Sequence, residues 1–468
     1  MLPLLWGLRR TKGPNPKYTA LDSAQEARVS YRFHMRSITT IPSLMLFFFF
    51  FGGTPGTPTN VKPQADPGLR LADSTVASWV AAEKVPGAVL LVSRRGKTVL
   101  KVAYGSARLF EYQDGEYQAH PGNPAIPGSL RRLNKPEPMT AVKVFDLASV
   151  TKVMATTMAI MMLVDRGQVY LDSPVSTYLP DFSGAEKEHI TVRHLLTHRS
   201  GLPQWLPIYY HAGNTEDAYD YIRRLQLAWP IGLQRHYSDL GFMLLGLIVE
   251  QVSRNPLDTF LDNELYTPLG LSSTGFQPTG ARDEAKDDGA FAATSHGNPY
   301  EHRMIYDPAF GYRIEVDPDT WDGWRTYTLS GEVNDGNAFH TFGGVAGHAG
   351  LFSSATDLRV LLQLLLDEGE YENRRYMSAG VIKTFFTDTG DGQALGWQIP
   401  TEAPHGSFSH TGFTGTFVLG VPEEDLAVVL LTNRQNSGVG ADGMYSDIGP
   451  LQQAISRALT EQRGGPTP

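Results

Sequence analysis

The segment LASVTKVMATTMAIMMLV occupies residues 147–164. Its composition and apolar spacing predict a helix packed in a hydrophobic core, and its flexible methionines suit core packing: Met154, Met158, Met161 and Met162. The only Ser-x-x-Lys of the chain, Ser149 to Lys152, stands near its start. Residues three apart share one face of a helix, so the hydroxyl and the ammonium should lie side by side.

A serine hydroxyl becomes a useful nucleophile when a base lies within hydrogen-bond reach. Lys152 can take or relay the proton if burial or nearby positive charge lowers its pKa. Tyr237-Ser238-Asp239 follows 88 residues after Ser149, before an apolar helix expected at 242–249. A phenol beside an ammonium could act as base and then as acid toward the leaving group. The alternative for Ser149 is an ordinary serine near a helix cap.

A third motif, His410-Thr411-Gly412-Phe413, begins on a predicted strand at 407–411. An edge strand there could present backbone groups to an extended substrate, and Gly412 would let the substrate approach the backbone. The alternative is a strand with a polar edge.

The rest of the chain supplies a sheet and helices. The middle, roughly 165–340, is predicted to be helix and loop, and 108–138 a long surface excursion rich in Pro, Gly and charge. Helices are expected at 71–82 and 449–460, and strands at 88–92, 98–104, 407–411, 416–421 and 426–432. The expected fold class is therefore α/β (α+β): an antiparallel sheet of about five strands flanked by helices, with an all-helical insertion.

In this order and context, the three motifs resemble the serine β-lactamase and penicillin-binding superfamily. The chain is most similar to the branch of class C β-lactamases, D-alanyl-D-alanine carboxypeptidases and β-lactamase-like esterases. The resemblance covers about residues 70–460, including the stretches 172–180, 194–203 and 343–353.

The resemblance implies that Ser149 is the nucleophile, that Lys152 and Tyr237 transfer its proton, and that Asp239 and residues 410–413 bind substrate. It also implies an oxyanion hole made by the backbone N–H groups of Ser149 and Phe413. His348, in the glycine-rich stretch 343–353, is interpreted as structural.

Two positions depart from the family pattern. Asp239 stands where many relatives have Asn, and His410 replaces the usual Lys. A carboxylate cannot donate to a substrate carbonyl, and a mostly neutral imidazole grips a substrate carboxylate less well than an ammonium does. Both changes disfavour strong β-lactamase activity and favour activated esters over cephalosporins.

The amino-acid composition limits the kinds of partner and cofactor that we expect for this chain. The net charge is −9, the pI is near 5.8, and no long basic run follows the first forty residues, so nucleic acid is not expected. The chain has no cysteine, which excludes disulfides and thiolate metal sites. His194 and His198 have the spacing of a zinc-binding pair but lack the metalloprotease Glu, so neither a metal nor a cofactor is expected.

The N-terminus suggests export. Residues 1–34 are basic and lack hydrophobic periodicity, as in a disordered leader or a mis-assigned start. In residues 35–56, Arg36 precedes an apolar run at 44–51 and a small-residue tract, the form of a signal peptide or uncleaved N-terminal anchor; the alternative is a chance hydrophobic tail. A linker at 57–67, a catalytic domain at 68–462 and a disordered tail at 463–468 should follow.

The sequence thus predicts an exported, periplasmic or extracytoplasmic serine hydrolase that acts through an acyl-enzyme. Its substrate would be a small molecule or a peptidoglycan fragment: an ester, a D-alanyl peptide or, weakly, a β-lactam. The alternative is a penicillin-binding or peptidoglycan-sensing protein with little turnover. Membrane association through the N-terminal segment and the oligomeric state stay open.

Overall fold

A computed structural model describes residues 60–61, 66–113, 118–120, 123–126, 130–184, 186–276, 289–307, 312, 316–440 and 442–460. Its α-helices are α1 (Pro67–Ala81), α2 (Met158–Asp165), α3 (Val192–Leu196), α4 (Thr215–Arg224), α5 (Asp239–Ser253), α6 (Leu257–Leu261), α7 (Pro299–Tyr306), α8 (Gly336–His340), α9 (Ala355–Leu366), α10 (Ala379–Phe385) and α11 (Gly449–Thr460). The predicted leader, signal segment and tail, with most of the linker, lie outside the described residues.

The strands include one large antiparallel sheet, which runs in the order β11-β12-β13-β1-β2-β5. The strand bounds are β1 (Gly87–Arg94), β2 (Lys97–Tyr112), β3 (Gln118–His120), β4 (Asn123–Ile126), β5 (Leu130–Pro138), β6 (Val144–Asp146), β7 (Gly275–Phe276), β8 (Leu351–Ser354), β9 (Glu370–Tyr371), β10 (Arg374–Arg375), β11 (Phe408–Thr411), β12 (Thr416–Val421) and β13 (Leu426–Thr432). The predicted initial hairpin and final three-stranded meander are confirmed, and β13 joins them by pairing with β1.

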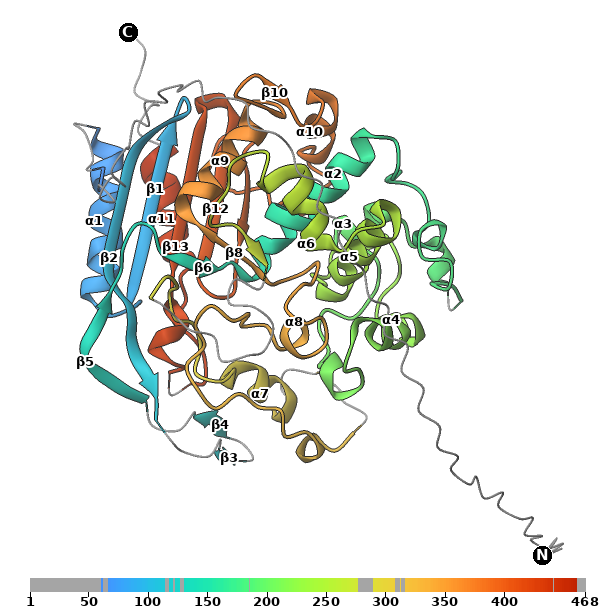
Figure 1. The fold of residues 1–468 in the computed structure, drawn as a ribbon, viewed down its shortest axis with the longest axis horizontal. Coiled ribbons are helices and arrows are strands. Elements are labelled where there is room, and N and C mark those ends of the chain that lie inside the picture. Colours follow the sequence, from blue (N-terminus) through green and yellow to red (C-terminus); the bar gives the residue numbers. More distant parts are fainter. Residues whose placement is uncertain are drawn as a thin grey trace, which may run out of the picture. The chain divides into compact units, whose positions relative to one another are not determined.

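The sheet is covered on both faces (Figure 1). Side chains alternate along each strand, so Leu90 packs toward α1 and α11, whereas Val89 and Leu91 pack into the larger core on the other face. That larger core contains α9 and the helical segment that follows Ser149. Burial on both faces explains why β1 and β13 are continuous apolar runs.

The prediction that 108–138 is a surface excursion is wrong at both of its ends. Strand β2 continues to Tyr112, and β5 pairs with it as a sixth strand at the sheet edge. Strand β5 has the sequence LRRLNKPEP, whose charges and prolines are typical of an exposed edge strand that must resist pairing with another chain. The same composition is typical of a loop, which is why the sequence pattern misled.

The predicted insertion contains helices α3 to α8, but it is not all-helical. Strand β7 lies within it and pairs with β8, in a small sheet of order β6-β8-β7. Two residues are too few to show an alternating pattern, so β7 has no signal in the sequence.

The segment after Ser149 is helical throughout, though only partly α. A 3₁₀ turn covers Ala148–Val150, a π-helical stretch covers Lys152–Thr157, and α2 completes it. Among the described helices, Ala148–Asp165 is long and apolar enough to span a membrane, but 83% of it is buried inside the protein. Burial and the packed methionines identify it as the core helix that the sequence predicted.

The turn between β11 and β12 is fastened to the backbone just before Ser149. Thr414 Oγ1 donates to the carbonyl of Asp146 at 2.8 Å, and Thr416 Oγ1 donates to that of Leu147 at 2.9 Å. A Cβ on Gly412 would lie 2.0 Å from Thr416 Oγ1 and 2.4 Å from the Leu147 carbonyl oxygen. Gly412 is therefore required for packing of the protein against itself, a reason different from the predicted approach of substrate.

We expect Gly412→Ala to lower the free energy of unfolding by about 1–3 kcal/mol, because the added methyl group forces this turn away from Leu147. Thermal unfolding would show a fall in Tm. Gly213→Ala is the matched control, since a Cβ at Gly213 meets nothing within 4 Å. Equal melting temperatures for the two variants would contradict this explanation of Gly412.

Candidate active site

Ser149 lies in a tight turn that leads from strand β6 into the core helix. Ala148, just before it, has a φ of +45°, a backbone conformation that costs free energy for a residue with a Cβ. The buried carboxylate of Asp146 holds this turn, because its Oδ1 accepts from the Ala148 N–H at 2.8 Å and its Oδ2 from the Asn334 N–H. Burial raises the pKa of Asp146 to about 6.

Lys152 lies directly beneath the serine hydroxyl. Its ammonium Nζ donates to Ser149 Oγ at 3.0 Å and to the His348 carbonyl at 3.0 Å, and lies 2.7 Å from Asp239 Oδ1. The side chain is 0% exposed. Burial lowers the pKa of Lys152, but the charge of Asp239, together with hydrogen bonds to Asp239 and Tyr237, outweighs burial, so the pKa is raised. The sequence had led us to expect a base with a lowered pKa, and the carboxylate at 239 reverses that expectation.

Tyr237 lies against both residues. Lys152 Nζ is 5.0 Å from the centroid of the phenol ring, which leans on the His198 ring at a centroid distance of 4.4 Å. Burial raises the pKa of Tyr237, while the Lys152 charge and hydrogen bonds with Ser149 and Lys152 act in the opposite direction. The net rise means that the phenol keeps its proton, so Tyr237 is better suited to donate than to accept.

Asp239 is placed by the start of α5. Ser238 caps this helix by accepting from the Gly241 N–H, and its own hydroxyl donates to the Pro203 carbonyl. His198 Nδ1 accepts from the Ser238 N–H at 3.0 Å. His198 lies beyond the end of α3 with a φ of +56°, so it does not form a one-turn helical pair with His194.

Within the motif at 410–413, His410 is buried, whereas Phe413 lines the pocket. His410 is 1% exposed, and its Nδ1 lies 2.8 Å from the Thr411 carbonyl oxygen. Burial lowers the pKa of His410 to about 3, so its ring is neutral at physiological pH. Phe413 is partly exposed, and Arg434 fixes its carbonyl with two hydrogen bonds.

These residues surround a pocket of about 230 Å³. Of the predicted site residues, Ser149, Tyr237, Asp239 and Phe413 line this pocket, whereas His410, Thr411 and Gly412 are not among its described lining residues. Lys152 lies behind Ser149 and is covered by it.

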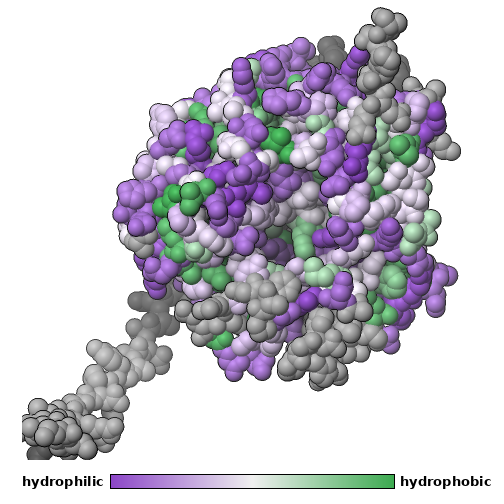
Figure 2. Space-filling model, turned by 180° about the vertical axis from the view of Figure 1, so that it is seen from behind, coloured by the Kyte–Doolittle hydropathy of each residue, from purple (hydrophilic) through white to green (hydrophobic). Residues whose placement is uncertain are grey.

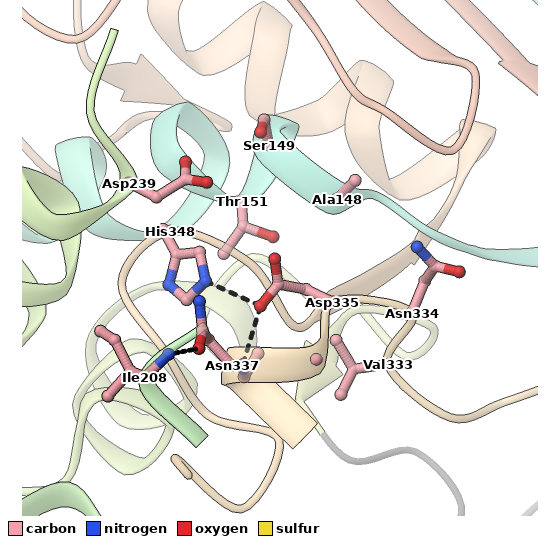
Figure 3. Close-up of polar contacts among 12 residues, drawn as sticks. Ala148, Ser149, Thr151, Ile208, Asp239, Val333, Asn334, Asp335, Asn337 and His348 are labelled. Atoms are coloured by element: carbon pink, nitrogen blue, oxygen red, sulfur yellow. Dashed lines mark hydrogen bonds and ion pairs between the residues drawn. The ribbon is translucent and has the colours of Figure 1, made fainter. Parts of the chain in front are cut away.

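Sequence reasoning missed three residues that line the same pocket. His348 Nε2 lies 2.9 Å from Asp335 Oδ1, and Asp335 also caps α8 by accepting from the Ala338 N–H (Figure 3). Glu301 is buried, accepts from the Gly336 N–H at 2.9 Å, and has its pKa raised to about 8 by burial and by Asp335. His348 had been interpreted as purely structural; its contact with Asp335 depends on tertiary structure and has no signature of its own in the sequence.

The chain is similar to known proteins over most of its length. The family model described as Beta-lactamase matches residues 72–448. The chain is 33% identical over 396 residues to an N-acetylmuramyl-L-alanine amidase of Bacillus subtilis (strain 168), covering 79% of this chain and 82% of that protein. It is 30% identical to a protein of Escherichia coli (strain K12) provisionally named D-alanyl-D-alanine carboxypeptidase, covering 76% and 80%.

Solved structures show the same fold. A penicillin-binding protein homologue from Caulobacter crescentus superposes with a TM-score of 0.60 at 18% identity, covering 86% of this chain and 99% of that one. The hydrolase EstCE1 superposes with a TM-score of 0.59 at 20% identity, covering 84% and 98%. Together with the family match over most of the chain, these findings establish that the protein belongs to the β-lactamase family of serine hydrolases.

Proposed function

We propose that Ser149 is the nucleophile of a serine acyl hydrolase, that Lys152 and Asp239 move its proton, and that Tyr237 protonates the leaving group. The observation that carries the proposal is the chain of contacts from Ser149 Oγ to Lys152 Nζ at 3.0 Å and on to Asp239 Oδ1 at 2.7 Å. Both distances allow direct proton transfer, and Ser149 lines the pocket where an acyl group would bind.

Acylation begins when Ser149 Oγ bonds to the carbonyl carbon of the substrate. The serine proton passes to Lys152 as Lys152 gives one of its protons to Asp239, so Lys152 remains an ammonium and Asp239 becomes neutral. The backbone N–H groups of Ser149 and Phe413 stabilise the oxyanion of the tetrahedral intermediate.

Collapse of the intermediate breaks the bond to the leaving group. That group takes a proton from the Tyr237 phenol, which is protonated because burial raises its pKa. Tyr237 regains a proton from Lys152, and Lys152 from Asp239, which restores the starting state. Water repeats the sequence to release the acid and free Ser149.

The substrate is proposed to be an ester or amide, including amide bonds of peptidoglycan fragments. The amidase and carboxypeptidase names of the relatives support this class. The neutral, buried His410 and the pairing of Lys152 with Asp239 leave neither side chain as a free cation for a substrate carboxylate. Strong β-lactamase activity is therefore not part of the proposal.

The first prediction tests the nucleophile. Ser149→Ala should abolish labelling by a fluorophosphonate and lower kcat/KM for p-nitrophenyl esters by about 10³-fold or more, because no other hydroxyl replaces Oγ. Ser74→Ala, at an exposed serine of α1, is the control and should retain full labelling. Labelling of the Ser149→Ala protein at another serine would refute the assignment.

The second prediction concerns pH. Asp239 raises the pKa of Lys152, so Asp239→Asn should lower that pKa, because one close opposite charge is lost. Without the carboxylate, only the uncharged amine of Lys152 can accept the serine proton. The kcat/KM of the variant should therefore fall at pH 7 by about 10²-fold and recover as pH rises between about 7 and 10.

Wild type should lack this recovery, since its ion pair accepts the proton while Lys152 stays charged. The matched control is Asp172→Asn, which removes an exposed carboxylate that pairs with Arg193 and is not among the described pocket-lining residues. A profile for Asp239→Asn that is parallel to that of wild type would contradict the role given to Asp239.

The third prediction concerns export, which we propose from the pattern at 35–56. A chain starting at Met35 should carry a fused reporter out of the cytoplasm, and Phe48→Asp, which interrupts the apolar run, should prevent it. A chain starting at Asn60 should stay in the cytoplasm and hydrolyse esters, because it keeps the Val61–Lys101 bridge and the Asp66 cap of α1. Equal retention of both chains would disprove the signal.

A further inference from the structure

The pocket beside Ser149 is lined by acidic side chains. Three carboxylates line it, those of Asp239, Glu301 and Asp335, while no Lys or Arg is among its described lining residues. Each carboxylate comes from a different element: the start of α5, α7 and the cap of α8.

The cations nearest to these carboxylates are already engaged. Lys152 pairs with Asp239 behind the pocket wall. Arg325 is buried and pairs with Glu332, and it also donates to the Val333 and Asn334 carbonyls. Although Arg325 lowers the pKa of Glu301, burial and Asp335 keep that pKa raised to about 8, so Glu301 adds a full negative charge to this wall only as the pH passes 8.

Aromatic rings and one imidazole complete the pocket. Trp205, Tyr300, Tyr312 and Phe413 line it, and the Tyr300 and Phe413 ring centroids are 5.0 Å apart. His348 is 1% exposed; its Nε2 is engaged with Asp335, and its Nδ1 has no hydrogen-bond partner among the described residues. If Nε2 carries the proton toward Asp335, Nδ1 presents a lone pair, which is a receptor for an N–H group.

We propose that this pocket selects substrates that carry an ammonium group, and that Glu301 and Asp335 bind that group. Carboxylates attract a cation, aromatic faces stabilise it further, and a buried acceptor such as His348 Nδ1 orients its N–H groups. The same charges repel a substrate carboxylate. This inference rests on the proposed hydrolysis at Ser149 and narrows it to amine-bearing esters and amides, such as peptide fragments with a free amino group.

The surface offers no competing explanation in the view opposite to Figure 1. Hydrophilic residues dominate that face, and its hydrophobic residues form small separate patches, as Figure 2 shows.

The test compares three p-nitrophenyl esters of matched length: 6-aminohexanoate, heptanoate and hydrogen adipate, whose acyl chains end in an ammonium, a methyl group and a carboxylate. We expect kcat/KM for the ammonium ester to exceed that for heptanoate by about tenfold or more, with the carboxylate ester slowest. A second pair of substrates places the charge in the leaving group instead of the acyl chain. Acetylthiocholine carries a quaternary ammonium there, and S-(3,3-dimethylbutyl) thioacetate carries an uncharged group of the same shape. Thiol release is readily followed with a thiol reagent, since the chain has no cysteine.

Glu301→Gln keeps the shape of the side chain and should reduce the ammonium-to-methyl ratio severalfold at pH 9, where Glu301 has lost its proton. Glu250→Gln is the matched control: this carboxylate is also mostly buried and accepts the Leu257 N–H, but it lies on α5 away from the described pocket lining. Thermal unfolding of both variants separates a binding effect from misfolding. The substrate ratios of the wild-type protein test the proposal even if a variant fails to fold.

The preference should also depend on pH. The groups that face Glu301 are Asp335, Arg325, Tyr209 and Tyr445, and their combined effect with burial places its pKa at about 8. An alkylammonium stays charged to higher pH, so the ammonium-to-methyl ratio should rise between about pH 7 and 9 as Glu301 loses its proton.

The outcomes separate the two proposals. Hydrolysis of heptanoate that disappears in Ser149→Ala supports the proposed function, whatever the ratios are. A ratio near one in both substrate sets, or a preference for the carboxylate ester, would overturn the ammonium pocket while leaving the nucleophile in place. Hydrolysis that survives Ser149→Ala would overturn the proposed function instead.

Discussion

The buried ammonium of Lys152 is the constraint on which the site depends. An ion removed from water costs several kcal/mol unless its charge is paired and its protons are all hydrogen-bonded. Here three segments far apart in the sequence meet that requirement, through Ser149 Oγ, the His348 carbonyl and Asp239 Oδ1. Satisfying this single group brings together the serine turn, the glycine-rich loop and the start of α5.

The glycine-rich loop reaches Lys152 because its backbone packs closely against α5. A Cβ on Gly347 would lie 2.1 Å from the Phe242 carbonyl oxygen, and Gly246 of α5 lies directly against it. Thr156 on the core helix donates to the Gly347 carbonyl, which fixes the loop from the other side. The His348 carbonyl and side chain are then held where one receives Lys152 and the other meets Asp335.

The carboxylate at 239 changes both the chemistry and the charge of the site. By stabilising the ammonium, Asp239 removes the uncharged lysine that a simple base mechanism would use, and in the proposed mechanism it becomes the acceptor at the end of a proton relay. It also adds a third acidic side chain to the pocket wall that contains Glu301 and Asp335. Asp239, a single departure from the family pattern, thus affects two properties in these proposals. It changes how Ser149 is activated, and it changes the substrate charge that the pocket favours.

The sequence by itself determined the large elements and the closeness of Ser149 and Lys152. The short continuous apolar runs of β1, β12 and β13 and the apolar helix after Ser149 are local patterns, so the hairpin, the meander and the core helix were predictable. Ser149 and Lys152 are three residues apart, and any helical turn brings them together. The predicted catalytic roles of these residues follow from the family resemblance.

Only the tertiary structure decided the protonation of the site side chains and which residues line the pocket. A pKa depends on burial and on charges brought close by folding, which is why Lys152 and Tyr237 have raised pKa values and His410 a lowered one. Edge strand β5 and strand β7 were missed because their composition or length carries no periodic signal. Glu301, Asp335 and His348 meet across long sequence separations, and only the folded chain brings their side chains to one pocket beside Ser149.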